Sequence, residues 1–448
     1  MQPENFDKPL DAIVAAVQLP HVSDAEFESS LAELRDLAKT LGYKVVQSFV
    51  QKRASFDTTA YLGAGKREEI GAYVTRHADT ARDTAPGHAT NPQADGIEVL
   101  LIDHEISPSQ ARNLEKAVGC AVMDRTMVIL EIFHRNARSS AARAQVEIAR
   151  LGYMAPRLRE AAKLAGPQGR QRSGTGGRGA GESHTELDRR KVRDRIAELQ
   201  LDIDAMDVER QTQRARRQQG QGLASVALVG YTNAGKSTLM RALTGSDVLI
   251  ANKLFATLDT TVRTLHPESV PRVLVSDTVG FIKNLPHGLV SSFKSTLDEA
   301  LDAALLLHVI DASDPGFKRQ LQVTDEVLAE IGAHEVPRIR VFNKIDHVGD
   351  ATAQAACEAE LRTHDPNCVV MSARRPEDVA RLHRRIVAFF QKDLVEAELR
   401  LPWSAQPLRR DIYAQCEVLG EHADEDGAIF RVRAEPSTIR SLRERLEP

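Results

Sequence analysis

The residues most suited to chemistry form a glycine-rich run at positions 230–237, Gly-Tyr-Thr-Asn-Ala-Gly-Lys-Ser. An apolar segment, Ser225–Val229, precedes the run, and a helix-forming segment, Thr238–Leu243, follows it. This order predicts a phosphate-binding loop (P-loop), because glycines let backbone N–H groups wrap phosphates and the helix N-terminus adds a positive dipole. In such loops the lysine reaches the β- and γ-phosphates, and the hydroxyl binds magnesium. We expect nucleotide contacts from Gly230, Tyr231, Thr232, Asn233, Ala234, Gly235, Lys236 and Ser237, with Ser237 as a magnesium ligand.

A second motif consists of Asp277, Thr278, Val279 and Gly280. Asp277 would hold magnesium through a water, and the Gly280 N–H would sense the γ-phosphate. A plain exit from a strand into a turn is the alternative, which the order and spacing of the motifs disfavour. The next residue is Phe281, at the position where Ras-like proteins carry a water-orienting glutamine. An apolar side chain cannot orient water, so we expect slow intrinsic hydrolysis and a partner that completes the site.

Two later motifs point to the base. An aspartate after a strand can accept hydrogen bonds from both N1–H and the exocyclic amine of guanine, and adenine offers no such pair. A buried carboxylate facing adenine would stay unpaired, at a cost of roughly 1–3 kcal/mol or more. The motifs therefore predict GTP rather than ATP. The predicted base-binding residues are Asn343, Lys344, Ile345, Asp346, Ser372, Ala373 and Arg374.

A magnesium-binding threonine is expected between the first two motifs. Thr257, Thr260 and Thr261 all qualify on spacing alone, although a run of threonines can also be merely β-prone. The segment predicted to contact the nucleotide contains Phe255, Ala256, Thr257, Leu258 and Asp259.

The elements that would position these motifs alternate between strand and helix. Residues 13–19, 44–50 and 97–103 are apolar strand candidates, while residues 26–41 and 107–118 have helical spacing. This alternation predicts an α/β layer in the first 130 residues. The run Gly63–Lys66 resembles a phosphate loop faintly, but it lacks the Lys-Ser/Thr ending and is interpreted as an ordinary turn before a helix from Arg67.

Charge is concentrated in residues 135–181, which hold ten basic and two acidic side chains. This segment carries +8, so the remaining chain carries −12 within a net charge of −4. Its residues 165–181 include seven glycines and three arginines (Arg170, Arg172 and Arg178), a composition that holds neither helix nor strand. A flexible linker and a loop that orders on a polyanion are both consistent with this composition.

The sequences on either side of this loop favour binding to a polyanion. Val192, Ile196, Leu199, Ile203 and Met206 repeat with steps of four and three, and residues 144–162 carry a similar stripe interrupted by Pro156. A helical hairpin with a glycine-arginine tip is the predicted structure. A coiled-coil seam and an ordinary core-facing stripe explain the repeat equally well.

Length and composition limit the classes of protein. The chain has 448 residues, of which 42% are hydrophobic and 27% charged, as in soluble globular proteins of about three domains. The start lacks the features of a signal peptide, and no apolar run approaches the roughly 20 residues that span a bilayer. Four scattered cysteines are typical of reduced thiols. The cytoplasm is the expected compartment, with loose membrane association left open, and a monomer is expected.

Taken together, the motifs resemble a translation-factor-class GTPase, and the whole chain resembles the HflX family of bacterial ribosome-associated GTPases. The similarity covers roughly residues 10–435. It includes Tyr61–Lys66 with Glu68–Ile70, Asp124–Thr126 with Ile129–Phe133, Gly176–Glu182 with Asp188–Arg190, Phe255–Asp259, and Asp277–Ile282 with Leu285-Pro286.

The resemblance implies GTP and magnesium as ligands, and it selects Thr257 as the magnesium-binding threonine. It also implies that the protein binds the large ribosomal subunit and its rRNA and splits stalled ribosomes under heat stress. It also implies that the hairpin loop lies near the peptidyl-transferase centre, so Arg170, Arg172 and Arg178 would contact RNA. In some related GTPases an asparagine at the position of Asn233 helps bind potassium; a structural role in the tight loop is the alternative. Asp259 is followed by Thr260 where the family often has proline.

The predicted fold class is α/β and multidomain. We expect an N-terminal α/β domain at 1–134, a helical hairpin with its basic loop at 135–220, a GTP-binding domain with a parallel-type sheet flanked by helices at 221–392, and a small C-terminal α/β appendage at 393–448. Two other functions remain open: a GTPase partner in tRNA modification, and a nucleotide-gated switch that binds proteins or membranes.

Overall fold

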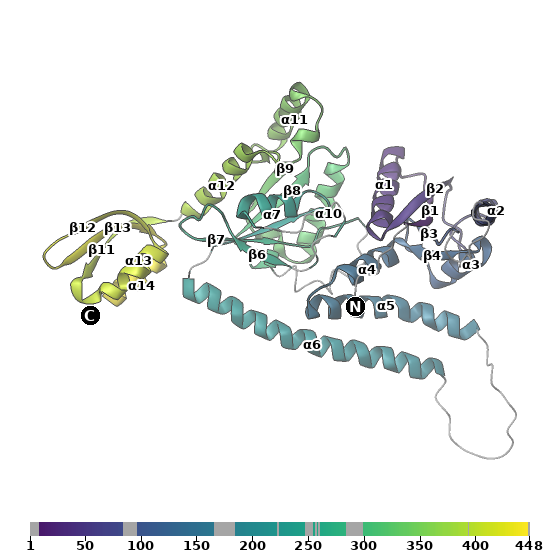
Figure 1. Cartoon of the computed structure of the whole chain (residues 1–448), viewed down its shortest axis with the longest axis horizontal. Helices are drawn as coiled ribbons and strands as arrows, with labels where there is room; N and C mark the ends of the chain where they lie inside the picture. Colours follow the sequence, from purple (N-terminus) through teal and green to yellow (C-terminus); the bar gives the residue numbers. More distant parts are fainter. Residues whose placement is uncertain are drawn as a thin grey trace, which may run out of the picture. The chain divides into compact units, whose positions relative to one another are not determined.

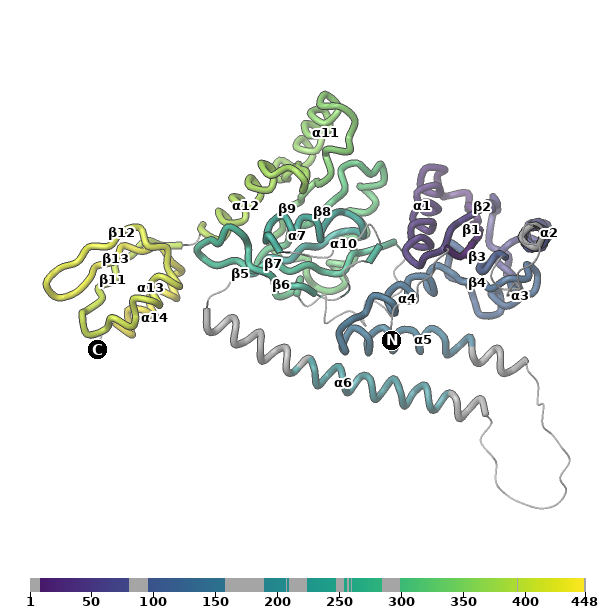
Figure 2. The backbone as a smooth tube through the Cα atoms, viewed as in Figure 1, coloured from purple at the N-terminus to yellow at the C-terminus, as the bar shows by residue number. Residues whose placement is uncertain are grey.

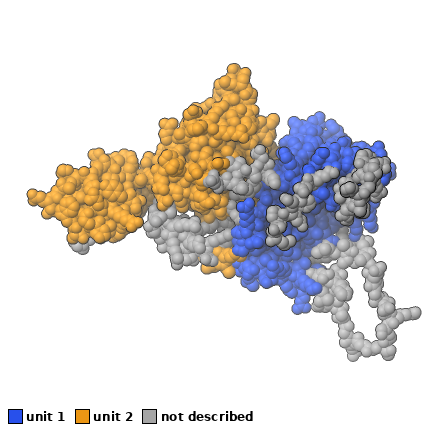
Figure 3. Space-filling view, viewed as in Figure 1, with its two compact units in different colours: residues 1–204, 252–255, 284–293 blue, residues 205–251, 256–283, 294–448 orange. Residues whose placement is uncertain are grey.

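The computed structural model describes residues 9–83, 96–164, 184–221, 224–246, 254–255, 258, 260–283, 299–392 and 394–446. The chain forms two compact units, coloured separately in Figure 3. Residues 1–204 and 252–255 belong to the first unit, while residues 205–251, 256–283 and 294–448 belong to the second. The predicted basic loop and its arginines, Arg170, Arg172 and Arg178, lie outside the described residues.

The first unit contains a four-stranded sheet with the order β2-β1-β3-β4, and all its pairs are parallel. Parallel strands need helical crossovers, which explains the strand–helix alternation of the sequence. The elements, labelled in Figure 1, are β1 (Leu10–Gln18), α1 (Asp24–Thr40), β2 (Tyr43–Lys52), α2 (Ala64–Asp83), β3 (Val99–Ile102), α3 (Pro108–Val118), β4 (Ala121–Asp124) and α4 (Arg125–Asn136). The predicted α/β layer is therefore present.

Local signals explain where these helices begin and which face they bury. Ser107 caps α3 in a reciprocal capping box with Gln110. The predicted apolar face of α1 is buried. One boundary prediction was wrong: α2 begins at Ala64 rather than Arg67, so most of the predicted turn is the first turn of a helix.

Two long helices form the predicted hairpin arms, α5 (Ser140–Leu164) and α6 (His184–Gln221). Figure 2 traces both, and α5 continues through Pro156. Leu199 and Ile203 of α6 form a small apolar cluster with Ala144, against which Ile148 and Leu151 pack. The predicted stripes of the two helices thus meet.

The second unit is built around a six-stranded sheet with the order β10-β9-β8-β5-β7-β6. Its pairs are parallel except β6–β7, which is antiparallel. The strands are β5 (Ala224–Gly230), β6 (Thr261–Thr264), β7 (Val273–Asp277), β8 (Leu305–Asp311), β9 (Arg338–Asn343) and β10 (Val369–Val370); the helices are α7 (Lys236–Thr244), α10 (Phe317–Glu330), α11 (Ala351–His364) and α12 (Pro376–Gln391). Strands β5, β7 and β9 each end at a predicted motif, so the parallel arrangement gathers the motifs at one edge of the sheet.

The C-terminal residues form a smaller antiparallel sheet, β11-β13-β12, with two helices. Its elements are β11 (Val395–Pro402), α13 (Arg409–Gln415), β12 (Glu417–Ala423), β13 (Gly427–Ala434) and α14 (Pro436–Leu446). The predicted strand after the turn at 424–427 is confirmed. Within the described chain, no helix is both long and apolar enough to cross a bilayer.

Candidate functional site: a nucleotide-binding edge of the second sheet

The P-loop joins β5 to α7. Glycine is required at its two glycine positions because there is no room for a Cβ and because the backbone has a positive φ. Gly230 has φ +144°, and a Cβ there would lie 2.2 Å from the Val309 carbonyl oxygen. Gly235 has φ +96°, and its Cβ would lie 2.3 Å from Asn343 Nδ2. Any other residue would displace β8 or the base-binding motif, so these glycines let the loop pack closely against both.

Lys236 is buried at the start of α7, and its ammonium points back into the loop. Nζ donates to the carbonyl oxygens of Gly230 at 3.0 Å and Tyr231 at 2.8 Å. Burial lowers the pKa of Lys236 to about 8; the Asp277 carboxylate opposes this shift and the Lys344 charge adds to it. An anion bound in the loop would favour the charged ammonium, as expected for a phosphate-binding lysine.

The two predicted magnesium ligands of the P-loop and the second motif lie side by side. Ser237 Oγ donates to Asp277 Oδ2 over 2.8 Å, and Asp277 is fully buried at the end of β7. A hydroxyl and a carboxylate oxygen at one point suit Mg²⁺, a hard cation that takes oxygen ligands. Ser237 directly and Asp277 through water would hold Mg²⁺, which supplies charge neutralisation between the β- and γ-phosphates when bound.

The second motif is joined to the P-loop through the main chain. Phe281 N donates to Gly230 O at 3.1 Å, and Thr232 N donates to Phe281 O at 2.7 Å. A third hydrogen bond joins the same two segments: the Tyr231 hydroxyl accepts from Lys283 N at 2.8 Å. A Cβ on Gly280 would lie 3.0 Å from Lys236 Nζ, so the Gly280 backbone is placed beside the lysine that is predicted to bind phosphate. Phe281 itself is 2% exposed, so its side chain serves the core rather than the reaction.

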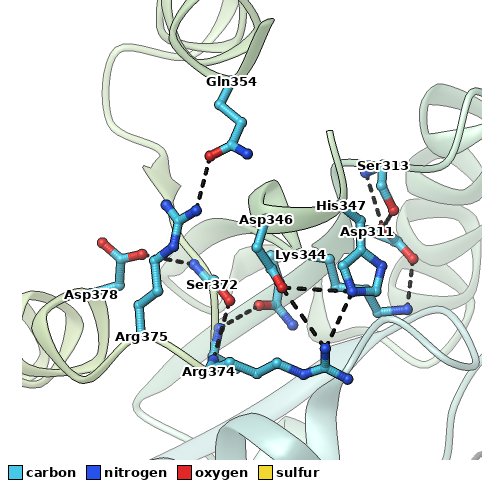
Figure 4. A network of polar contacts seen from close by, with 12 residues as sticks. Asp311, Ser313, Lys344, Asp346, His347, Gln354, Ser372, Arg374, Arg375 and Asp378 are labelled. Carbon is cyan, nitrogen blue, oxygen red and sulfur yellow. Dashed lines mark hydrogen bonds and ion pairs between the residues drawn. The ribbon is translucent and has the colours of Figure 1, made fainter. Parts of the chain in front are cut away.

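Asn343 organises the end of the site that is predicted to bind guanine. Its Nδ2 donates to Ala234 O at 3.0 Å, and its Oδ1 accepts from Ala373 N at 2.9 Å. This buried amide therefore ties the P-loop to the Ser372–Arg374 loop. Lys344, at φ +62°, donates to Asp311 Oδ2 at 2.7 Å, a contact seen in Figure 4.

Asp346 carries the carboxylate predicted to read guanine. His347 Nε2 lies 3.6 Å and Arg374 Nη1 lies 4.0 Å from Asp346 Oδ2, and Figure 4 shows both beside it. Burial alone would raise the pKa of Asp346, but hydrogen bonding to Ser372 and the charges of His347 and Arg374 outweigh it and lower the pKa below its usual value. The carboxylate is thus held in the ionised form that accepts two hydrogen bonds.

The structure describes only part of the predicted magnesium-binding segment. Ala256, Thr257 and Asp259 lie outside the described residues, while Leu258 is buried. Thr261 begins β6 and pairs with Asp277 across the antiparallel ladder, so it serves as a strand residue. Asn233, for which potassium binding and a structural role in the tight loop are the two interpretations, is exposed at φ +59°.

Sequence reasoning missed the contacts at the start of this segment. Leu254 N donates to Thr40 Oγ1 at 3.2 Å, and Asn136 Nδ2 donates to Phe255 O at 2.8 Å. The Phe255 ring packs edge-to-face on Phe133, with ring centres 4.6 Å apart. These side chains at the ends of α1 and α4 belong to the same compact unit as residues 254–255. No sequence signal foretold the contacts, because they join positions 119 and 214 residues apart.

The family motif Asp124–Thr126 also has a structural explanation. Asp124 caps α4 through Met127 N at 2.9 Å and accepts from Arg157 at 2.7 Å and from the Tyr153 hydroxyl. Arg125 is 2% exposed, and it pairs with Asp103 at 3.0 Å and with Glu33. These charges form ion pairs inside the first unit.

Comparisons with known proteins agree with this geometry. Family models described as "GTP-binding GTPase N-terminal", "GTP-binding GTPase Middle Region" and "50S ribosome-binding GTPase" match residues 28–134, 136–217 and 225–344. The protein described as "GTPase HflX" of Gluconacetobacter diazotrophicus is 50% identical over 97% of both chains. The "GTPase HflX" of Escherichia coli is 36% identical over 95% of this chain and 93% of its own.

Among solved structures, a GTP-binding protein of Sulfolobus solfataricus in complex with GDP aligns with a TM-score of 0.42 and 23% identity, over 84% of this chain and 99% of that chain. The sequence similarity to the two GTPase HflX proteins covers the N-terminal sheet, the hairpin arms and the nucleotide-binding edge. The chain therefore belongs to the GTPase HflX family, and it binds and hydrolyses GTP.

Proposed function

We propose that this GTPase binds the large ribosomal subunit through its rRNA and splits or rescues stalled ribosomes, with heat stress as the condition. The family model for residues 225–344, whose description names 50S binding, supports the choice of partner. The +8 charge of residues 135–181 supports an RNA contact, because arginines gain affinity by displacing counterions from phosphates.

The observation that carries the proposal is a pair of hydrogen bonds that side chains of α1 and α4 make with the backbone of Leu254 and Phe255. Phe255 lies two residues before Thr257, the predicted magnesium ligand. A GTP-dependent movement at Thr257 would therefore pull on helices of the unit that also carries α5 and the start of α6. Such a link is what a ribosome-splitting factor needs, because nucleotide state must reach the RNA-binding part.

Co-sedimentation with ribosomes in GTP, GDP or a non-hydrolysable analogue tests the function, with free subunits counted in the supernatant. We expect GTP and the analogue to favour binding to large subunits and to increase the fraction of free subunits. Large subunits should also stimulate the slow intrinsic hydrolysis. A titration of large subunits that changes neither the rate nor the free-subunit count would contradict the proposal.

A charge-reversal variant tests the RNA contact. Arg170→Glu, Arg172→Glu and Arg178→Glu together should lower subunit affinity at least tenfold and flatten its salt dependence, while GTP affinity stays unchanged. The matched control reverses three arginines on helices α11, α12 and α14, namely Arg362, Arg384 and Arg440. Equal losses in both variants would point to nonspecific electrostatics, and retained binding in the first variant would refute the loop contact.

A further inference from the structure

The ammonium of Lys344 is held by a carboxylate that the sequence motifs do not include. Asp311, the last residue of β8, accepts a hydrogen bond from Lys344 Nζ through its Oδ2 atom at 2.7 Å. Both side chains are largely shielded from solvent, with 15% of Asp311 and 21% of Lys344 exposed. Solvent screens a partly buried ion pair less than an exposed one, so this pair can fix the direction of the lysine.

The Asp311 carboxylate itself has a fixed orientation. Its other oxygen, Oδ1, accepts from Ser313 N at 3.0 Å and from Ser313 Oγ at 2.6 Å. The end of β8 is in turn fixed on β9, because Asp311 pairs with Asn343 in the ladder and Ala312 N donates to Asn343 O at 2.8 Å. Figure 4 shows Ser313, Asp311 and Lys344 as a continuous chain of contacts. Asp311 is therefore a preorganised anchor for the lysine.

The Lys344 side chain runs between two fixed points. Its backbone has φ +62°, in the left-handed region that residues other than glycine rarely adopt. A Cβ on Gly235 would lie 3.8 Å from Lys344 Cε, so the lysine stem lies next to the P-loop backbone. A lysine stem is an apolar surface that can cover a flat ring. Because both ends of the side chain are held, this surface has one orientation at the predicted guanine end of the site.

We propose that Asp311 is a positioning residue for nucleotide binding, which holds the Lys344 ammonium so that the lysine stem packs on the flat face of the guanine ring. Ser313 assists by fixing the Asp311 carboxylate. This role is separate from that of Asp346, whose predicted contacts are with the edge of the ring. It does not involve ribosomes, so its test is independent of the function proposed above.

The first test measures nucleotide affinity and turnover separately. Asp311→Ala should raise the Kd for GDP roughly tenfold, because the lysine loses a charge-assisted hydrogen bond. Turnover at saturating GTP should change less than about twofold, because the lysine stem contacts the base equally before and during the reaction. The matched control is Asp314→Ala in the same loop, where Oδ1 accepts from Gly316 N at 2.7 Å and Oδ2 accepts from Gln320 Nε2 at 2.7 Å. The control should bind GDP as the parent does.

Two further readouts distinguish positioning from a general effect on the fold. Lys344→Met keeps an apolar stem and removes the ammonium, so adding Asp311→Ala to this variant should weaken GDP binding no further. Inosine diphosphate lacks the exocyclic amine that Asp346 is predicted to bind. Asp311→Ala should therefore lower the affinities for GDP and inosine diphosphate by the same factor, whereas Asp346→Ala should lower the GDP affinity more. Thermal melts followed by circular dichroism check that each variant is folded at the assay temperature.

Parent-like GDP affinity in folded Asp311→Ala would overturn the proposal, because the lysine would then need no anchor. Additive losses in the double variant would also overturn it, since Asp311 would act by a route other than Lys344. An equal loss of affinity in Asp314→Ala would assign the effect to the stability of the loop. If Asp311→Ala does not fold, Asp311→Asn takes its place; it keeps an acceptor oxygen without the charge, and it should show a smaller loss that again disappears with Lys344→Met.

Discussion

The N-terminal sheet and the six-stranded sheet both gather charged side chains at the carboxyl ends of parallel strands, and the two edges differ in how those charges are paired. In the N-terminal sheet, Asp103 at 3% exposure and Arg125 at 2% form a buried ion pair. In the second sheet, Lys236 bonds to carbonyl oxygens of its own loop, and the Thr232 hydroxyl is without a partner in the described residues.

The difference separates a structural edge from a reactive one. Burial of charge costs several kcal/mol per ion, and the N-terminal edge offsets this cost with internal partners. At the nucleotide-binding edge, part of the free-energy cost of burying the Lys236 charge is not offset, because burial lowers the pKa of Lys236. An anionic ligand would supply a partner for this ammonium, so the presence of buried charges alone does not identify a site.

The largest expected effect tests the structural edge. Arg125→Met should lower the free energy of unfolding by about 3–5 kcal/mol, because Asp103 would remain as a buried charge without its main counterion. GTP affinity of the folded fraction should stay unchanged. Chemical denaturation and fluorescent-nucleotide titration measure the two quantities.

The control for this prediction is Arg195→Met on α6, where an exposed arginine pairs with Glu198 at 2.7 Å. An exposed pair of this kind contributes little to stability, because solvent screens the two charges. A loss of GTP affinity in folded Arg125→Met would show that the N-terminal edge also serves the nucleotide, and the contrast between the edges would fail.

The next effect tests the nucleotide-binding edge. Asp346→Ala should reduce GTP affinity by roughly 10- to 100-fold, because two guanine donors would lose their acceptor, at about 1–3 kcal/mol. The control Asp350→Ala removes the cap of α11, where Oδ1 accepts from Ala353 N at 2.9 Å. It should cost about 1 kcal/mol of stability and leave GTP affinity intact. Equal GTP affinity in both variants would exclude Asp346 as the base-reading residue.

The smallest effect is a dependence on pH. Burial lowers the pKa of Lys236 to about 8, below its ordinary value of 10.5, so the lysine loses its charge above pH 8. GDP affinity should therefore fall by at most tenfold per pH unit above that value. Stability of the unliganded protein should gain from the same group as pH rises from 8 toward 10.5, because the unfolded chain then binds a proton that the native state lacks.

Titrations between pH 7.0 and 8.8 with Lys236→Met as the reference check this prediction. The variant should bind more weakly throughout, and it should lack the part of the slope contributed by Lys236. Parallel curves for both proteins would show that the ammonium does not titrate in this range.

Much of the nucleotide-binding edge could be predicted from the sequence because its motifs are local. The Gly230 and Gly235 spacing, the strand before each motif and the aspartate after β9 all depend on short stretches of chain, whose geometry follows from glycine conformation and apolar runs. The parallel sheet then brings the strand ends together, so residues predicted separately form one site.

The sequence by itself thus determined the fold class and the family resemblance, and it predicted the residues that are expected to face the nucleotide. Only the tertiary structure decided which charged or polar groups are satisfied: Arg125 by Asp103, and Thr232 by nothing in the described chain. It alone also joined Phe255 to Phe133 and Asn136. Such contacts depend on packing between distant segments, and periodicity and spacing carry no information about which distant side chain completes a hydrogen bond.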